Sequence, residues 1–117
     1  MFEKNLQLAE LIDLYAALLS DRQQRVLDLY YNQDLSLGEI AGDLGISRQG
    51  VRDSIKKAER ELYFFESKLH LAARESKVRE AGEKLLALTR DNAQMSAAAE
   101  HLIALASGEE MPLNVLS

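Results

Sequence analysis

The stretch that decides the fold is residues 36–62, "SLGEIAGDLGISRQGVRDSIKKAEREL". Ser36 and Glu39 form a capping-box pattern, in which each side chain bonds the other residue's backbone amide at the start of a helix. Gly45 suits the left-handed residue that ends a helix, and Ser47 is a good N-cap for another helix only two residues later. Two helices joined so tightly must cross steeply, which predicts a helix-turn-helix.

The helix that starts at Ser47 has no stop signal for more than twenty residues. Its apolar residues form a heptad seam that spans roughly 27 Å at about 1.5 Å per residue. The first part of the seam must pack within the helix-turn-helix, and the later part needs a partner, either within the chain or in a second copy. Tyr63 and Phe64 lie off the seam, so we expect this part of the helix to be covered on more than one side. The seam consists of Val51, Ile55, Ala58, Leu62, Phe65 and Leu69.

Two further helices precede this stretch. Between Leu6 and Leu19 the apolar residues recur at steps of three and four, which predicts a helix with one buried face. Ser20 and Gln23 make another capping box, which opens a second helix that ends at "NQD", residues 32–34.

Beyond residue 74 the sequence predicts one or two more helices. A boundary is expected near "TRDN", residues 89–92, where Asp91 or Asn92 is suited to cap the following helix. We therefore predict an all-α protein with three parts. These are a helix-turn-helix domain without a wing at 1–73, a C-terminal helical extension at 74–107 and a flexible tail at 108–117.

The composition agrees with an all-helical chain and excludes several classes of protein. Apolar residues make up 47% of the 117 residues, and there are only six Gly and one Pro. The absence of cysteine excludes disulfides and thiolate metal sites. The N-terminus does not resemble a signal peptide, and no run approaches the roughly 20 apolar residues of a membrane span. We expect a soluble cytoplasmic protein that does not contact a membrane.

Positive charge is concentrated in one segment of an acidic chain. The net charge is −5, yet residues 47–60 carry five basic and two acidic side chains, giving +3. In a helix-turn-helix the second helix lies in the major groove of DNA, with its N-terminal residues near the base edges. We expect Arg48, Gln49 and Arg52 to reach bases, while phosphates are bound by Lys56, Lys57, Arg60 and the backbone amide of Ser47.

Other features of this helix oppose strong binding. Asp53 lies on the same outward face, where it would repel phosphate, and an excess of +3 supplies few phosphate contacts. Gly50 lies in the first turn, at a cost of about 1 kcal/mol relative to Ala unless something must approach closely there. The alternative is that these side chains form an ordinary solvated face on a fold kept for its shape.

No catalytic or metal-binding set can be assembled from the sequence. His70 and His101 lie in different segments, and neither has a carboxylate or second histidine at ligand spacing. There is no Gly-rich phosphate loop, nucleophile triad or paired-carboxylate cleft. We expect neither an enzyme nor a cofactor, a metal or a small-molecule substrate.

Residues 19–69 resemble the helix-turn-helix of region four of bacterial sigma factors. They are still more similar to the small YlxM-like proteins encoded beside the signal recognition particle GTPase genes. The resemblance rests on "LYY", "DLSLGEIA", "GISRQGV" and "KLHL", and it covers about the first 75 residues. It implies a sigma region-four-like bundle whose long recognition helix extends into a dimerisation or packing seam. Sigma factors usually carry Thr where this chain has Gly50, and a complete sigma factor is excluded by length.

Three hypotheses follow. The first is a DNA-binding regulator that dimerises through the long helix, using Leu62, Tyr63, Phe64, Phe65 and Leu69, and through the C-terminal segment. The second is an accessory that contacts the signal recognition particle, its RNA or its GTPase. The third is a module whose helix-turn-helix binds only another protein, which exposed Tyr63 or Phe64 would favour.

Overall fold

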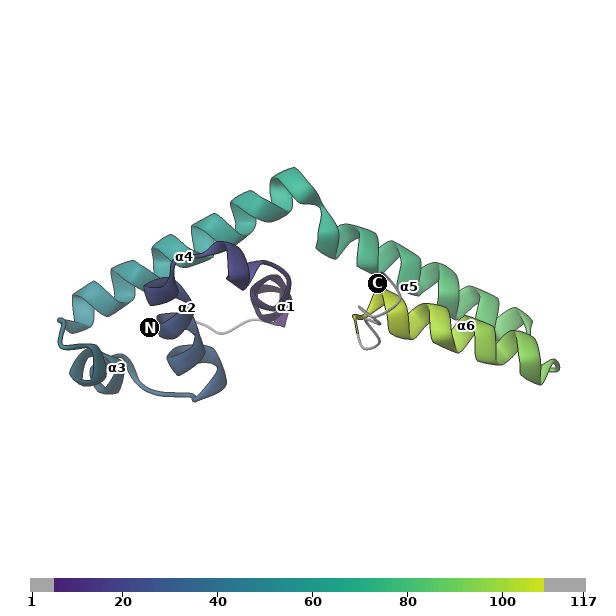
Figure 1. Cartoon of the computed structure of the whole chain (residues 1–117), viewed down its shortest axis with the longest axis horizontal. Helices are drawn as coiled ribbons and strands as arrows, with labels where there is room; N and C mark the ends of the chain where they lie inside the picture. The colour runs from purple at the N-terminus through teal and green to yellow at the C-terminus, as the bar shows by residue number, and fades with distance from the viewer. Residues whose placement is uncertain (1–5, 109–117) are drawn as a thin grey trace, which may run out of the picture. The chain divides into compact units, whose positions relative to one another are not determined.

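The computed structural model describes residues 6–108, and within that range the regular structure is entirely helical. The prediction of an all-α protein is confirmed. The chain divides into two compact units, unit 1 at residues 1–70 and unit 2 at residues 71–117. Unit 1 contains helices α1 to α4, and unit 2 contains α5 and α6 (Figure 1). Most of the predicted tail, residues 109–117, lies outside the described residues.

The first predicted helix is shorter than expected. Helix α1 spans Leu6–Tyr15, a 3-10 turn, η1, follows at Ala16–Leu18, and Leu19 is extended at φ −84° and ψ 163°. The chain must leave the helix here because Ser20 needs an extended backbone to cap the following helix. Leu19 nevertheless remains buried. The apolar periodicity therefore continues through a turn that the pattern alone does not reveal.

Both predicted capping boxes are present. Helix α2, Asp21–Leu27, begins with the Gln23 amide donating to the Ser20 hydroxyl at 3.2 Å while the Ser20 amide donates back to Gln23 at 3.0 Å. Helix α3, Leu37–Leu44, begins with the same reciprocal pair between Ser36 and Glu39. Helix α2 continues into a π-helical turn, η2, at Asp28–Asn32, which the sequence did not predict.

The predicted helix-turn-helix is formed by α3 and α4. Gly45 ends α3 in the left-handed conformation, with φ 68° and ψ 33°. Ser47 then accepts a hydrogen bond from the Gly50 amide at 2.9 Å and caps α4, which spans Arg48–Leu69. Only Gly45, Ile46 and Ser47 separate the two helices, so the caps inferred from the sequence place α4 correctly.

The core of unit 1 covers one side of α4. Val51, Ile55, Ala58 and Leu62 are fully buried, and Phe65 is half-buried with its ring centroid 6.0 Å from that of Tyr15. The first part of the seam thus packs within the chain.

The other side of α4 is open near its C-terminal end. Tyr63, Phe64 and Leu69 are 43%, 57% and 46% exposed. The expectation that this part of α4 is covered on more than one side is wrong within unit 1. Helices α1, α2 and α3 pack against the seam side, and no described element of that unit buries the opposite side.

Unit 2 is an antiparallel helix pair (Figure 1). Helix α4 ends at His70, which has a left-handed backbone with φ 57°, and α5 spans Leu71–Leu88. Helix α6 spans Ala93–Ala106 and begins with the Asn92 side chain accepting from the Met95 amide at 3.0 Å, so the predicted cap near "TRDN" is confirmed. No described helix is both long and apolar enough to cross a membrane.

Candidate nucleic-acid interface

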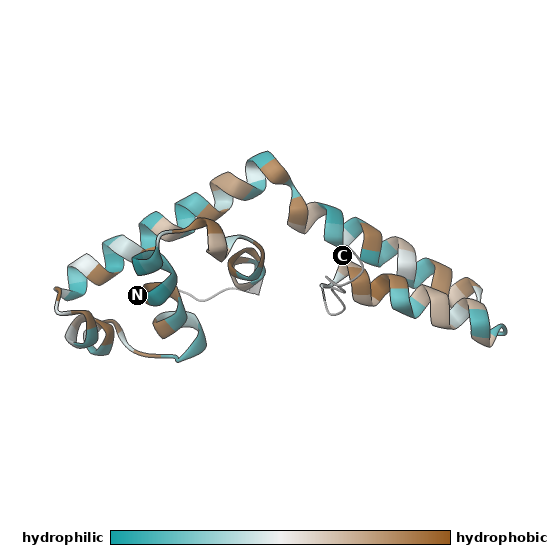
Figure 2. Cartoon of the chain, in the orientation of Figure 1, coloured by the Kyte–Doolittle hydropathy of each residue, from teal (hydrophilic) through white to brown (hydrophobic). Residues whose placement is uncertain are grey.

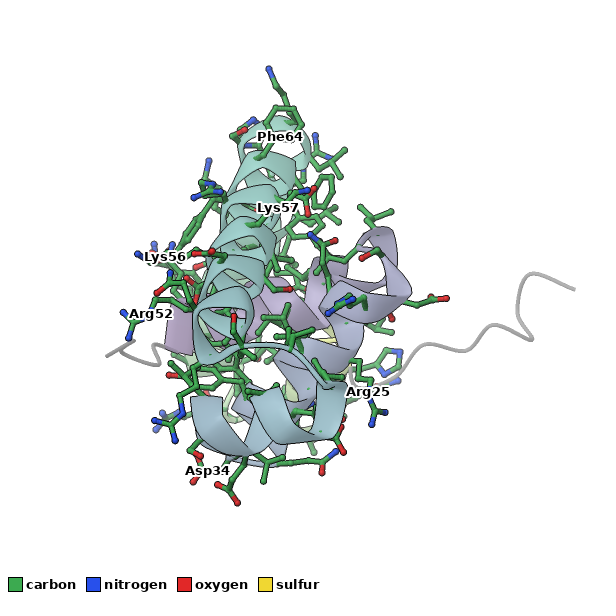
Figure 3. The ribbon with its side chains drawn as sticks, turned by 90° about the vertical axis from the view of Figure 1, so that its left-hand side faces the viewer. Arg25, Asp34, Arg52, Lys56, Lys57 and Phe64 are labelled. Atoms are coloured by element: carbon green, nitrogen blue, oxygen red, sulfur yellow. The ribbon has the colours of Figure 1, made fainter. Side chains whose placement is uncertain are left out.

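Helix α4 separates buried apolar residues from basic residues around its circumference. Every residue of the predicted DNA-binding set lies at the N-cap or in the first four turns of this helix, where the buried side faces α1, α2 and α3. Figure 3 shows Arg52 and Lys56 projecting on one side of α4, away from the rest of unit 1. Arg52 is half-buried, and the remaining members are exposed: Ser47, Arg48, Gln49, Lys56, Lys57 and Arg60.

A surface hollow lies where α3 meets the start of α4. It is lined by the N-cap and the first two residues of α3 and by the three predicted base-reading residues: Ser36, Leu37, Gly38, Arg48, Gln49 and Arg52. A Cβ added at Gly38 would lie 3.1 Å from Nε and Nη2 of Arg48. Glycine at this position therefore leaves room for the Arg48 guanidinium to lie against α3. The structure thus brings Arg48, Gln49 and Arg52 together at one hollow.

Asp53 is exposed on the outward face, as expected, but it has a partner there. Nε2 of Gln49 donates to Oδ1 of Asp53 at 2.8 Å, one helical turn away. The carboxylate therefore holds the Gln49 amide along the helix surface. To pair with a base edge, Gln49 would have to exchange this bond for another one.

Three other carboxylates of α4 form hydrogen bonds with the elements that pack against it. Glu59 accepts from the Tyr31 hydroxyl at 2.9 Å, and Glu66 accepts from the Tyr15 hydroxyl at 2.6 Å. Glu61 accepts from the side-chain amide of Gln23 in α2. Sequence reasoning missed these bonds, because each partner lies 28 to 51 residues away along the chain.

The Tyr31–Glu59 contact also changes the acid–base properties of the phenol. Burial raises the pKa of Tyr31 above its ordinary value of 10.0, and the hydrogen bond to Glu59 raises the pKa further. Tyr31 therefore stays protonated and continues to donate to Glu59 throughout the neutral range. Glu59, Glu61 and Glu66 are in this way bonded to neighbouring elements, whereas Asp53 remains with the basic side chains on the outer surface.

Gly50 lies close to the cap of α4. A Cβ added there would be 3.2 Å from the Ser47 hydroxyl oxygen and 3.6 Å from Cδ1 of Ile46. From the sequence, a glycine is expected here only if something approaches the helix closely. The groups that do so are the capping Ser47 and the turn residue Ile46. The absence of a side chain at Gly50 therefore leaves room for the turn between α3 and α4.

The two histidines belong to different units. His70 is the residue that ends α4, and His101 lies on α6. Among residues 6–108 there is no group of three or more His, Cys, Asp or Glu side chains that could hold a metal ion.

The fold and this surface define a helix-turn-helix protein. The chain matches the model of the family UPF0122, described as "Putative helix-turn-helix protein, YlxM / p13 like", over residues 2–102. The chain belongs to this family, so the resemblance inferred from its motifs is confirmed. The match extends well beyond the first 75 residues, into α6. The family is one of helix-turn-helix proteins and not an enzyme family.

Individual relatives show the same relationship. The chain is 48% identical over 75 residues to a UPF0122 protein of Thermoanaerobacter sp. strain X514, which covers 64% of this chain and 64% of the relative. It is 43% identical over 88 residues to one from Lacticaseibacillus casei strain BL23, covering 75% and 78% of the two chains. A relative from Limosilactobacillus reuteri strain DSM 20016 is 39% identical over 101 residues, or 86% of this chain and 89% of that one.

Proposed function

We propose that this protein is a DNA-binding regulator that lays the N-terminal half of α4 in a major groove. The observation that carries the proposal is the separation of charge on α4. Its basic residues between 48 and 60 point outward, while Glu59, Glu61 and Glu66 are bonded to side chains of unit 1. Three of the four carboxylates of α4 are thus bonded away from the surface that would meet a phosphate backbone, and the fourth, Asp53, stays on that surface and accepts from Gln49.

We propose different tasks for the two ends of this surface. Arg48, Gln49 and Arg52 lie together at the first turns of α4, the part of a recognition helix that meets base edges. Arginine donates in bidentate fashion to guanine and glutamine pairs with adenine. Lys56, Lys57 and Arg60 follow one to two turns later and suit phosphates, with the Ser47 amide as a further donor.

The charge balance also predicts how strong the interaction is. Five basic residues lie between positions 47 and 60 of a chain whose net charge is −5. At most five phosphates can be neutralised by them, so the slope of log K against log salt should not exceed about 4.5 in magnitude. Binding by a single copy should therefore be weak and sensitive to salt.

A second candidate function is favoured by the exposure of Tyr63 and Phe64. These aromatic residues are 43% and 57% exposed on the open side of α4, and the Lys68 ammonium lies 5.7 Å from the Phe64 ring centroid. Exposed aromatic side chains are enriched at protein–protein interfaces. The resemblance to proteins encoded beside signal recognition particle GTPase genes names the partner to test, the particle's RNA or GTPase. In either function the protein would work in the cytoplasm.

The test is a fluorescence-anisotropy titration of the full chain with random duplex DNA and with signal recognition particle RNA, each at low and high salt. Arg52→Ala is compared with Lys68→Ala, which removes the same charge from the same helix about 24 Å away. We expect Arg52→Ala to weaken DNA binding about tenfold, the equivalent of about 1.4 kcal/mol, and Lys68→Ala to have little effect.

The outcomes separate the candidates. If the protein binds the RNA more tightly than the DNA, the ligand of this surface is RNA and not DNA. Equal losses in both variants would show that binding follows overall charge and not the start of α4. Absence of binding to either nucleic acid at low salt would overturn the proposal and move attention to Tyr63 and Phe64.

A further inference from the structure

Unit 2 buries very little of its own surface. Among its described residues, only Gly82 on α5 and Ala99 on α6 are fully buried. A Cβ added at Gly82 would lie 2.8 Å from Cγ1 of Ile103, so the Ile103 side chain already packs directly against the α5 backbone at this glycine. The hairpin cannot gain a larger core by closing further. A unit of this size, without disulfide or metal, generally needs oligomerisation to be stable.

The apolar side chains of the hairpin instead form an exposed stripe on each helix. Positions 78, 81, 85 and 88 of α5 follow steps of three, four and three, as do positions 95, 98, 102 and 105 of α6. Alanines occupy the second position of each series, and large apolar side chains, 36% to 82% exposed, occupy the others. We call the large members the hairpin face: Val78, Leu85, Leu88, Met95, Leu102 and Leu105.

The two stripes lie on the same side of the hairpin. Gly82 is a helical neighbour of Val78 and Leu85, and a Cβ added to it would lie 3.7 Å from Cδ2 of Leu102. The α5 stripe therefore adjoins the α6 stripe. The opposite side of the pair is polar, with the exposed residues Ser76, Glu80, Glu83 and Glu100. The hairpin is thus amphipathic as a unit, and Figure 2 shows apolar residues along both of its helices.

We propose that the hairpin face is the dimerisation surface of this protein, and that a second copy of the same face covers it in an intermolecular four-helix bundle. A two-fold interface requires only one patch that is complementary to itself. The equal spacing of the stripes, with alanines between larger side chains, provides the knobs and holes that helix bundles interlock.

Charge favours a second copy over a charged partner. Residues 71–108 carry five basic and five acidic side chains, and Glu109 and Glu110 bring residues 71–117 to a net charge of −2. Two hairpins therefore carry little net charge with which to repel each other. A polyanion such as nucleic acid would find no excess of positive charge in this unit.

The exposed area also agrees with a dimer. The six residues expose on the order of 550 Å² per copy, so pairing two faces would remove at most roughly 1,100 Å² from water. That is the lower end of the range for specific interfaces. The sequence predicted dimerisation through both the long helix α4 and the C-terminal segment, but Leu62 of the α4 seam is fully buried inside unit 1. Dimerisation through unit 2 leaves the seam intact and does not depend on DNA binding.

The test measures the mass of the full chain in solution by sedimentation equilibrium over a range of concentrations. Wild-type protein should have twice the 13.1 kDa mass of one chain. Leu85→Glu places a charge at the centre of the hairpin face and should weaken dimerisation about 100-fold. Leu88→Glu, at a residue that is 82% exposed in the single chain, repeats the test at almost no cost to the hairpin itself.

The matched control is Ala87→Glu, which adds the same charge to the same helix on its opposite, exposed side. It should dimerise like the wild type, and helix content by circular dichroism should be equal in all three variants. A wild-type chain that is monomeric at every concentration would overturn the proposal. A dimer that survives both leucine substitutions, or that Ala87→Glu disrupts equally, would also overturn it.

Discussion

Unit 1 and unit 2 are both helical, but they place their apolar side chains differently. Within residues 6–108, fourteen of the fifteen buried apolar residues belong to unit 1, and the remaining one, Ala99, belongs to unit 2. Unit 2 has seven of the eleven large apolar residues that are exposed. The difference follows from the number of elements. Three helices converge on α4 in unit 1 and enclose its apolar side, whereas two helices in unit 2 can bury only the narrow strip between them.

The largest effect expected from this comparison is on the closed core. Leu62→Ala removes a fully buried side chain from α4 and should destabilise unit 1 by about 3 kcal/mol, through lost burial and the cavity that remains. Leu69→Ala changes the same residue type on the same helix where it is 46% exposed, so it should cost only about 0.5 kcal/mol. The measurement is the free energy of unfolding in urea. Similar losses would mean that the core does not close as described.

A smaller effect is expected from closing the gap between α5 and α6. Gly82→Ala places a Cβ 2.8 Å from Cγ1 of Ile103 and should destabilise the hairpin by about 1–3 kcal/mol. Gly42→Ala is the control in unit 1, because no atom lies within 4 Å of the added Cβ. It should stabilise α3 by about 0.5–1 kcal/mol. Thermal unfolding followed by circular dichroism distinguishes the two, and stabilisation by Gly82→Ala would contradict the close packing.

The smallest effect concerns the start of α3. The backbone amide and then the hydroxyl of Ser36 donate to the carboxylate of Glu39 and hold its pKa below the ordinary value of 4.5. A lowered pKa means that this carboxylate stabilises unit 1 at pH values above 4.5, and that the contribution disappears as the pH falls through the lowered pKa. Glu39→Gln keeps a capping side chain but does not titrate.

The measurement is the difference in unfolding free energy between wild type and Glu39→Gln from neutral to acidic pH. Wild type should lose stability relative to the variant as the solution becomes acidic. A difference that stays constant would show that the Glu39 carboxylate is not bonded to Ser36 in solution. Unit 2 provides the contrast, since its observed cap, Asn92, has no charge to lose.

Local signals in the sequence were enough for most of the fold. The caps at Ser20, Ser36 and Ser47 and the left-handed Gly45 lie where the pattern placed them, because each depends on residues within four positions. The end of α4 at His70 was missed, since neither glycine nor proline marks it. The early end of α1 was also missed, because the apolar spacing continues through the turn that follows it.

The candidate site was predictable in part. The spacing of basic residues from Arg48 to Arg60 indicates an outward face as soon as Val51 and Ile55 are assigned to the core. That assignment required only the helical period. The bond between Gln49 and Asp53 was within reach of the same reasoning, because the residues are one turn apart. The clustering of Arg48 against Gly38 needed the turn geometry.

By itself, the sequence determined that the chain is all-helical, that α3 and α4 form a helix-turn-helix, and that the start of α4 carries the positive charge. Only the tertiary structure decided which side chains Glu59, Glu61 and Glu66 bond to. It also decided which apolar residues remain exposed on α4 and on the hairpin. The physical reason is the separation along the sequence of the residues that interact. Caps and helical periods are set by neighbours a few residues apart, whereas burial and hydrogen bonds across 28 to 51 residues depend on how the helices pack.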